Sequence, residues 1–309
     1  MADWLSERKI DSLLFLALGS RKGEQRLYNK VWRLQRAELI RALSALGKAK
    51  INCLVFKGAE FVERYYHPHS MNVLADLDLL FHREDLLRVK SIFFALGYRQ
   101  AYFDEATMEL KDRDIGDVAA VEGAHYELAP FKRLVRLALS PEELSIAKSW
   151  NRSPIWIVDG ECFVAVEFDV HHGVATDIDS TALFERRVRS VFPHASTLCE
   201  ADQLWFTAAR LYNEVAIHNK VSLRDFAYLT PLLSSGSVDW KIVLGAAREY
   251  EIQCPLFYYF SFLRHLTGEA IPAEVIAALH PRKYPRLRDW GWQLEKLLDT
   301  VVDPPFLAP

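Results

Sequence analysis

The sequence predicts an α+β protein in which a small mixed sheet lies between two helical segments. Leucine and valine recur at three- and four-residue spacings over residues 27–46, the pattern of an amphipathic helix. Short apolar or alternating runs then predict buried strands, at residues 51–56, 74–81 and 161–170. From about residue 196 onward no convincing strand pattern remains. The chain is therefore expected to have three parts: a helical segment at 1–48, a mixed α/β core at 49–195 and a C-terminal helical domain at 196–309.

The composition favours a well-packed soluble protein with a compact partner. Half of the 309 residues are hydrophobic and 12% are aromatic, which is enough for a sizeable core. The formal net charge is -3 and the isoelectric point is about 6.4. Proteins that grip duplex nucleic acid are usually more basic, so we expect no duplex DNA partner.

The four cysteines and the N-terminal residues indicate a reducing compartment. No two cysteines form a C-x-x-C pair, so they are expected to be buried apolar side chains. The first twenty residues lack the basic region of a signal peptide, and no stretch reaches the ~18 apolar residues of a membrane span. We therefore expect a cytoplasmic protein with no membrane partner.

Residues that typically begin or end helices and turns indicate where the remaining elements lie. Gly47 is expected to end the first helix, Asp85 to cap a helix over 86–96, and Gly97 to end that helix. Asp159-Gly160 is a hairpin signal. Other expected elements are a helix at 59–66, strands at 124–128 and 155–158, and helices at 201–217, 221–233, 239–249, 254–267, 273–280 and 285–299.

The strand predicted at 74–81 carries two carboxylates. Asp76 and Asp78 are two residues apart and therefore point to the same face of the strand. Neighbouring carboxylates repel each other unless a cation lies between them. Magnesium takes carboxylate oxygens together with substrate phosphate oxygens, which explains the D-x-D pattern. The alternative is a solvated polar face on an edge strand.

Lys57 and Gly58 follow the first predicted strand directly. A glycine at a strand-to-helix turn lets the backbone approach a phosphate, and the helix N-terminus offers free N–H groups. Lys57 would add a positive charge beside that turn. An ordinary turn, with the lysine head in solvent, is the alternative.

The second chemically informative stretch is the strand at 161–170 and the residues that follow it. Glu167, Asp169 and His171 share one face of this strand. Asp169 is the candidate third carboxylate, since two-metal phosphoryl transfer draws carboxylates from more than one strand. Glu167 is expected to be a neighbour rather than a ligand. The roles of His171 and His172 stay open between structural and functional.

Three further groups have both a functional and a structural interpretation. His125 and Glu127 share a face of the strand expected at 124–128 and would line an acceptor site, bind metal or form a polar pair. Arg224 would hold a phosphate in a bidentate contact or pair with Asp225. The basic run at 132–136 is expected to be a solvated helix face.

The ordered motifs resemble the uncharacterised nucleotidyltransferase family, a bacterial branch of the polymerase-beta-like superfamily. The resemblance spans roughly residues 35–270. It rests on short motifs that occur in the same order as in the family: Lys57-Gly58, Tyr65-Tyr66, Pro68, D-L-D-L-L at 76–80, Gly97-Tyr98, His125-x-Glu127, D-V-H-H-G at 169–173, Leu223-Arg224-Asp225 and Asp239-Trp240.

The resemblance implies a polymerase-beta-like core and a Mg²⁺-dependent reaction. Two Mg²⁺ ions and an NTP, with ATP as the expected nucleotide, would be bound in a cleft between the core and the helical domain. On this reading Asp76, Asp78 and Asp169 bind metal, and Asp169 is also the base. Gly58 would belong to the nucleotide-binding turn, and similar folds hold the γ-phosphate with a lysine from the helical part, for which Lys220 or Arg224 is the candidate.

The acceptor for the nucleoside monophosphate is left open between a small molecule, a peptide, a protein side chain and an RNA end. Two departures from the family pattern favour a different hypothesis, a non-catalytic module that binds nucleotide or a partner. Ala59 replaces the usual second serine or glycine of the turn, and Asn72 lies where an arginine often precedes the D-x-D motif. A metal-dependent hydrolase is a third hypothesis, and its metal ligands would be His125, Asp169, His171 and His172.

Overall fold

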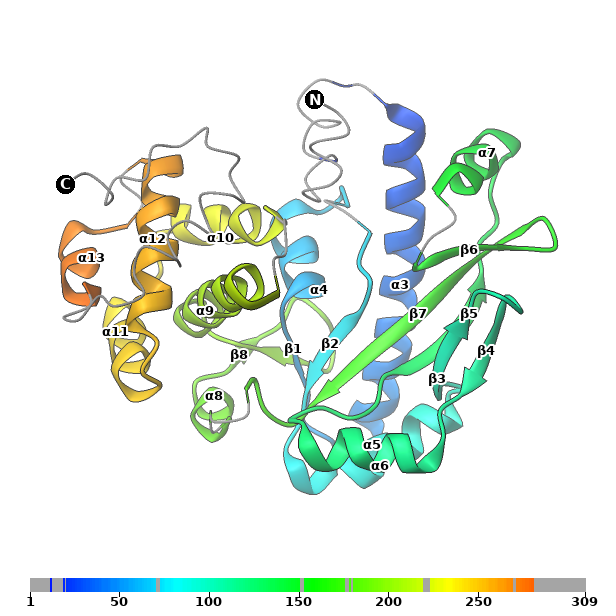
Figure 1. The fold of residues 1–309 in the computed structure, drawn as a ribbon, viewed down its shortest axis with the longest axis horizontal. Helices are drawn as coiled ribbons and strands as arrows, with labels where there is room; N and C mark the ends of the chain where they lie inside the picture. The colour runs from blue at the N-terminus through cyan, green and yellow to red at the C-terminus, as the bar shows by residue number, and fades with distance from the viewer. Residues whose placement is uncertain are drawn as a thin grey trace. The chain divides into compact units, whose positions relative to one another are not determined.

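The computed structural model describes the chain as two compact units (Figure 1). Their described parts are residues Ser12 to Leu198 and the residues from Cys199 onward. The described residues are 12, 19, 21–70, 73–150, 153–175, 178, 180–218, 223–268 and 271–280. Each unit is considered by itself below.

The first unit is built on an open mixed sheet with the strand order β4-β3-β5-β7-β2-β1-β9-β8, and β6 pairs with β7 outside this path. The strands are β1 (Leu54–Val55), β2 (Leu77–Leu80), β3 (Arg99–Asp104), β4 (Glu109–Asp112), β5 (Phe131–Arg136), β6 (Ile155–Val158), β7 (Glu161–His171), β8 (Val188–Arg189) and β9 (Ser196–Thr197). The α+β class predicted from the sequence is therefore confirmed.

Strand β7 is the centre of the sheet. The antiparallel strand β5 pairs with one of its edges, from Phe163 to Phe168. Its other edge is shared, because β6 pairs with the first part of β7 and β2 runs parallel to the last part. The carboxyl ends of β2 and β7 consequently lie at the same edge of the sheet, where their polar residues are neighbours.

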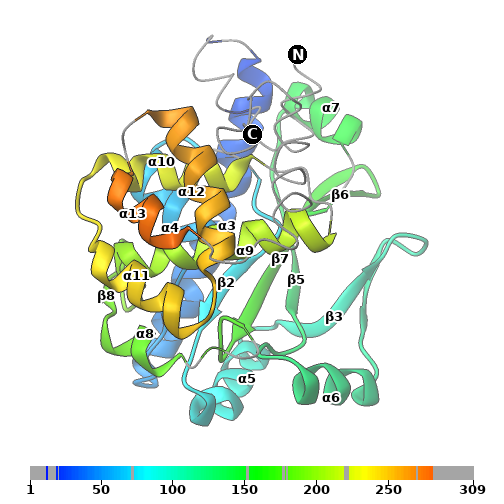
Figure 2. The same ribbon diagram turned by 60° about the vertical axis from the view of Figure 1, so that its left-hand side comes forward.

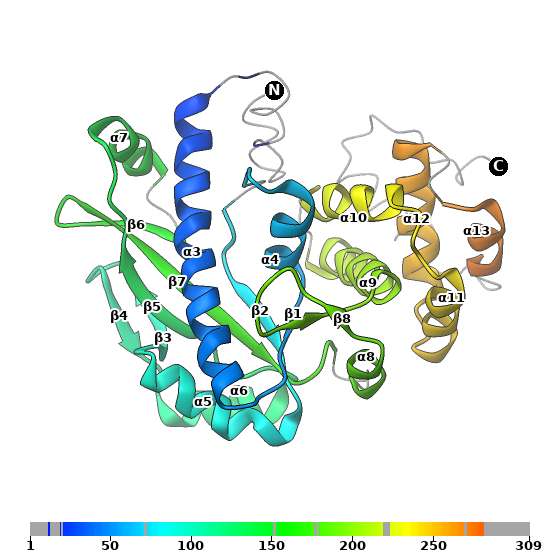
Figure 3. The same ribbon diagram turned by 180° about the vertical axis from the view of Figure 1, so that it is seen from behind.

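Helices cover one face of the sheet. The alternate residues Val166, Phe168 and Val170 of β7 are fully buried on this face. Helix α3 (Lys22–Lys48) packs against β7, and Phe93 of α5 (Leu86–Ala95) places its ring 5.0 Å from that of Phe168. Figure 3 shows α3 lying across the strands on this side. The odd-numbered residues of β7 point to the opposite face.

Shorter elements complete the first unit. The chain leaves β1 through Lys57 into α4 (Gly58–Phe61), which continues as a π-helical turn, η1 (Val62–Tyr66). The other elements are η2 (Arg83–Asp85), α6 (Ile115–Ala124), α7 (Pro141–Trp150) and α8 (Thr181–Glu185).

The described part of the second unit is helical. Its helices are α9 (Glu200–His218), α10 (Arg224–Ser234), α11 (Trp240–Glu249), α12 (Gln253–Thr267) and α13 (Ala273–Leu279). Helix α9 packs against α10, α11 and α12, and α13 packs against α12 (Figure 2). Buried aromatic rings fill the space between them, for example Phe226 stacked on Tyr259 at 4.5 Å.

Most elements expected from the sequence are confirmed. The strands expected at 51–56, 74–81, 155–158 and 161–170 are present as β1, β2, β6 and β7, although β1 is only two residues long. Asp159 and Gly160 have φ of 50° and 80°, as the hairpin requires, and Gly97 ends α5 with φ of 81°. The helices expected at 59–66, 86–96, 201–217, 221–233, 239–249, 254–267 and 273–280 are also present within a few residues.

Four expectations about secondary structure are wrong. Gly47 does not end the first helix, which runs on to Lys48; its missing side chain instead makes room for His194, whose ring carbon lies 3.0 Å from where a Cβ would be. Residues 124–128 form a single bridge, Glu127 with His171, because α6 extends to Ala124. The basic run at 132–136 is strand β5 rather than a solvated helix face. Strand β9 lies at Ser196–Thr197, although no strand was expected from about residue 196 onward.

Some predictions fall on residues that are not described. These are the helix at 285–299 and most of the first twenty residues of the segment 1–48. The three-part division at residues 48 and 195 stays a prediction.

Candidate metal and nucleotide site

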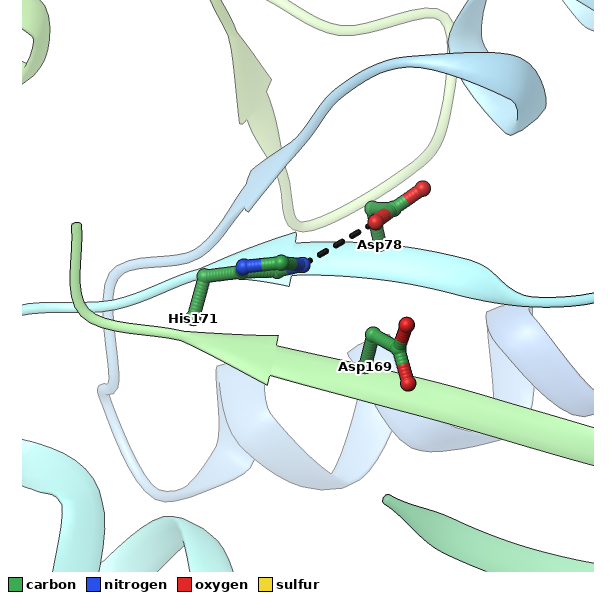
Figure 4. Close-up of side chains that lie close together, drawn as sticks. All are labelled: Asp78, Asp169 and His171. Carbon is green, nitrogen blue, oxygen red and sulfur yellow. Dashed lines mark hydrogen bonds and ion pairs between the residues drawn. The ribbon is translucent and has the colours of Figure 1, made fainter. Parts of the chain in front are cut away.

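Asp78 and Asp169 are direct neighbours on adjacent parallel strands. The register of β2 and β7 pairs Asp78 with Asp169 and Leu80 with His171. Figure 4 shows Asp78, Asp169 and His171 projecting together from these two strands. One ligand atom from each lies within 4.8 Å of the others, which is a group able to hold a metal ion. We call these three residues the Asp-Asp-His cluster.

Lys57 lies against the Asp-Asp-His cluster from the turn after β1. Its Nζ donates a hydrogen bond to Asp78 Oδ1 at 2.5 Å and lies 3.5 Å from His171 Nε2. Its backbone has φ of 57° and ψ of -138°, a conformation that a residue with a Cβ rarely adopts. Such backbone strain is typically found at functional sites, because the surrounding structure must hold it in place.

Burial and charge push the pKa values of the two aspartates apart. Burial works to raise the pKa of Asp78, but the charges and hydrogen bonds of Lys57 and His171 hold it well below its usual range. Burial, together with the charges of Asp76, Asp78 and Glu167, raises the pKa of Asp169 to about 9. Lys57 thus compensates the charge of Asp78, whereas at Asp169 its charge does not outweigh burial and the neighbouring carboxylates, and Asp169 resists ionisation.

Asp76 and Glu167 belong to the surroundings of the cluster. Asp76 lies just before β2 and is partly exposed. Its charge contributes to the raised pKa of both Asp169 and Glu167. Glu167 forms an ion pair with Lys132 of β5 at 2.5 Å, and burial is the main cause of its raised pKa. Asp76 is therefore close enough to the cluster for its charge to oppose ionisation of both Asp169 and Glu167.

His171 lies beside the aspartates and is enclosed by close neighbours. Its Nε2 lies 3.0 Å from Asp78 Oδ1, and its Nδ1 lies 3.3 Å from Glu127 Oε2. The Phe56 ring meets the imidazole edge-on at 5.2 Å, and Tyr126 stacks on it at 6.0 Å. Burial and the Lys57 charge lower the pKa of His171, which favours the neutral ring.

The residues present fit a divalent cation. Asp169 Oδ1 is buried and has no hydrogen-bond partner among the described residues. A buried polar atom without a partner costs about 1–3 kcal/mol, so its retention calls for an explanation such as an ion. Carboxylate oxygens are the ligands that Mg²⁺ prefers, and Asp78 and Asp169 supply them from neighbouring strands.

The structure brings together only some of the residues predicted for the site. Gly58 is the first residue of α4, next to Lys57, and the adjacent Ala59 side chain is buried. Lys220 and Asn72 lie outside the described residues. Arg224 belongs to the second unit, where its Nε lies 3.7 Å from Asp225 Oδ1 and its guanidinium 5.7 Å from the Tyr228 ring centre.

Of the histidines considered from the sequence, one joins the cluster. His125 is exposed at the end of α6, and His172 is half-buried; within the described part of the chain neither is in the metal-ligating group. The sequence analysis left the roles of His171 and His172 equally open. The distinguishing signal is the period of two, which places His171 on the same face as Asp169 and turns His172 away.

Comparison with known proteins places the chain in a family. The model of the family described as "uncharacterised nucleotidyltransferase" matches residues 22–268, so the chain belongs to this family. No curated protein and no solved structure matches it. No helix in the described part of the chain combines the length and apolar character of a membrane-spanning segment.

Proposed function

We propose that the protein is a Mg²⁺-dependent nucleotidyltransferase that moves a nucleoside monophosphate from an NTP, ATP being the expected one, to an acceptor hydroxyl. The observation that carries this proposal is the register pairing of Asp78 with Asp169 inside a chain of this family. Asp76, two residues before Asp78, is the third proposed carboxylate. Membership of the family supports the class of reaction, and the carboxylates support its dependence on metal.

The site residues would divide the work between metal binding and proton transfer. Asp76, Asp78 and Asp169 would hold two Mg²⁺ ions, which supply neutralising charge to the phosphate oxygens and activate the attacking hydroxyl. Asp169 is proposed to accept the hydroxyl proton, which requires its ionised form; the bound cations would lower the pKa that burial and neighbouring carboxylates raise in the metal-free site.

Lys57 is proposed to change partners when the site is loaded. In the structure its ammonium is the cation that compensates Asp78. A divalent ion bound to Asp78 would repel this ammonium, and the freed Lys57 would then bind a phosphate oxygen of the NTP. Gly58, at the start of α4, is proposed to let the same phosphate come close to the backbone.

The contribution of the second unit is proposed from the resemblance alone. Lys220 or Arg224 would bind the γ-phosphate, and the acceptor would be a small molecule, a peptide, a protein side chain or an RNA end. The contacts of Arg224 with Asp225 and Tyr228 favour a structural role for it in the absence of nucleotide. An Arg224→Met variant is therefore expected to raise KM for the NTP only if this arginine changes partners.

A label-transfer assay tests the reaction class. The wild-type protein and an Asp76→Asn/Asp78→Asn double variant are incubated with NTPs labelled at the α- or the γ-phosphorus, together with total RNA or a protein extract. The proposal predicts that α-label, but not γ-label, becomes covalently attached to an acceptor, and that the double variant transfers none. Attachment of γ-label instead would indicate a kinase, and equal α-transfer by the double variant would exclude this site.

A further inference from the structure

The two ring nitrogens of His171 face different groups. Nε2 lies 3.0 Å from Asp78 Oδ1 and 3.5 Å from Lys57 Nζ, inside the cluster. Nδ1 lies 3.3 Å from Glu127 Oε2, on the other side of the ring. The imidazole is only 3% exposed, whereas the Glu127 side chain is 37% exposed. The ring thus connects a buried cation-binding position to a carboxylate nearer the surface.

In the metal-free cluster His171 Nε2 is closest to a carboxylate. Asp78 Oδ1, an acceptor only, lies 3.0 Å from Nε2, so the ring proton is on Nε2 and is donated to Asp78. The Lys57 ammonium, which has donors only, lies farther from Nε2, at 3.5 Å. A metal ion in place of this ammonium would take the lone pair of Nε2, and the ring proton would then be on Nδ1. Glu127 Oε2 is an acceptor 3.3 Å from Nδ1, which has no hydrogen-bond partner among the described residues in the metal-free site.

This arrangement matches the surroundings of a metal-bound histidine. Such histidines almost always direct their second ring N–H to a carboxylate or carbonyl, which fixes the tautomer and the ring orientation. Glu127 is placed to do this, and the rings of Phe56 and Tyr126 flank the imidazole. The position that Lys57 Nζ fills is therefore one where a metal ion would find a nitrogen ligand as well as an oxygen ligand.

We propose that His171 is a nitrogen ligand of the divalent cation, that Glu127 positions it, and that this ligand makes the site prefer first-row transition-metal ions such as Mn²⁺ to Mg²⁺. The inference rests on the proposed function, since it specifies the metal class of the same site. Magnesium favours oxygen ligands, whereas imidazole suits transition metals such as iron and zinc; Mn²⁺ accepts the oxygen ligands of Mg²⁺ and stands at the start of the same transition-metal series. The identity of residue 171 then determines the metal, while Asp78 and Asp169 determine that a metal binds.

Pulsed electron paramagnetic resonance of Mn²⁺ added to the full chain tests this directly. Wild-type protein is expected to show coupling of the Mn²⁺ electron spin to one ¹⁴N nucleus, and His171→Asn is expected to lose it. His172→Asn is the matched control, because the adjacent histidine is outside the metal-ligating group; it should keep the coupling. Glu127→Gln should alter the ¹⁴N coupling parameters without abolishing Mn²⁺ binding.

Calorimetric titration with Mn²⁺ and with Mg²⁺ gives the selectivity. Oxygen-only sites also bind both ions, so the informative quantity is the change in the ratio of the two affinities. His171→Asn is expected to lower the ratio of the Mn²⁺ affinity to the Mg²⁺ affinity about tenfold, because it removes the nitrogen ligand, and Glu127→Gln is expected to lower this ratio less, because it leaves the ligand in place. An unchanged ratio in His171→Asn would overturn the proposal.

The outcomes separate this inference from the proposed function. Bound Mn²⁺ without ¹⁴N coupling in the wild type overturns the role of His171 and leaves nucleotidyl transfer intact. Coupling without any NTP binding supports His171 as a ligand and counts against nucleotidyl transfer. Failure to bind Mn²⁺ at millimolar concentration, with or without NTP, overturns both.

Discussion

Two lysine–carboxylate pairs lie on the same face of the sheet and differ in what surrounds them. Lys57–Asp78 and Lys132–Glu167 both have an N–O distance of 2.5 Å, and both lysine side chains are 18% exposed. Asp78 is 6% exposed and next to His171, and its pKa is lowered. Glu167 is 18% exposed, and its pKa is raised.

The difference shows that the same ion pair can serve two purposes. Lys132 extends from the regular strand β5, directly opposite Glu167 in the register, and the pair is an ordinary cross-strand contact. Lys57 reaches Asp78 from a strained turn and places its charge near His171 and near Asp169, whose Oδ1 has no hydrogen-bond partner among the described residues. We interpret the first pair as structural and the second as a cation site filled by the protein's own ammonium.

The largest expected difference is in turnover. Asp78→Asn should reduce kcat on the order of 10³-fold, because removing a group that stabilises transition-state charge typically costs about 10²–10³. Glu167→Gln, the matched change in the other pair, should cost less than about tenfold. Steady-state assays with circular dichroism as a folding control measure both. Equal losses in the two variants would remove the distinction between the pairs.

A smaller difference is expected in metal affinity without nucleotide. Lys57→Met removes the competing ammonium, so Mn²⁺ should bind about tenfold more tightly, a change of about 1.4 kcal/mol. Lys132→Met should leave the affinity within about twofold. Calorimetry on both variants decides the matter. Weaker Mn²⁺ binding by Lys57→Met would mean that the lysine supports the metal site rather than competing for it.

The smallest expected effect is on stability, measured in metal-free buffer. The pKa of Asp169 is raised from 3.8 to about 9. At a pH between these two values the folded state therefore holds a proton on Asp169 that the unfolded state has released. Stability from this group therefore falls as pH rises from about 4 towards 9. Asp169→Asn should flatten that slope and raise Tm at pH 8 by about 2–4 °C, the shift given by ~1 kcal/mol.

Thermal melts at pH 5 and pH 8 in the presence of a chelator measure this effect. Glu167→Gln provides the comparison within the other pair, since Lys132 already compensates Glu167. A steeper pH dependence in Asp169→Asn than in the wild type would show that the charge on Asp169 stabilises the metal-free fold.

The sequence allowed prediction of the strands that carry the site, but not of the rest of the sheet. Alternation of aspartate and leucine placed Asp78 on a buried strand, and the period of two placed Asp169 on the same side as His171. Strands β3, β4 and β5, which lie side by side on one side of β7, were not predicted. Their residues alternate weakly, and in β5 the basic residues Lys132 and Arg133 resembled a solvated helix until pairing with β7 was seen.

The details of the site also depend on contacts between distant segments. The D-x-D motif indicated that Asp76 and Asp78 form a carboxylate pair. The carboxylate paired with Asp78 in the register is instead Asp169 of β7, which lies 91 residues later in the chain (169 − 78). The position of Lys57 depends on a left-handed backbone conformation that no local residue type predicts. The bridge from Glu127 to His171 arises only after α6 ends. The periodicity of the sequence indicates which residues share a face of a helix or strand. Which residues are paired across the sheet depends on the register between the strands.

The most direct test of the account is calorimetric titration of the full chain with ATP and then each other NTP, with and without Mg²⁺ or Mn²⁺, in wild type and in Asp78→Asn. The account predicts that nucleotide binds tightly only with the divalent ion and that Asp78→Asn abolishes this dependence. Metal-independent binding that is unchanged in Asp78→Asn would contradict it, because the nucleotide would then be held without the Asp-Asp-His cluster.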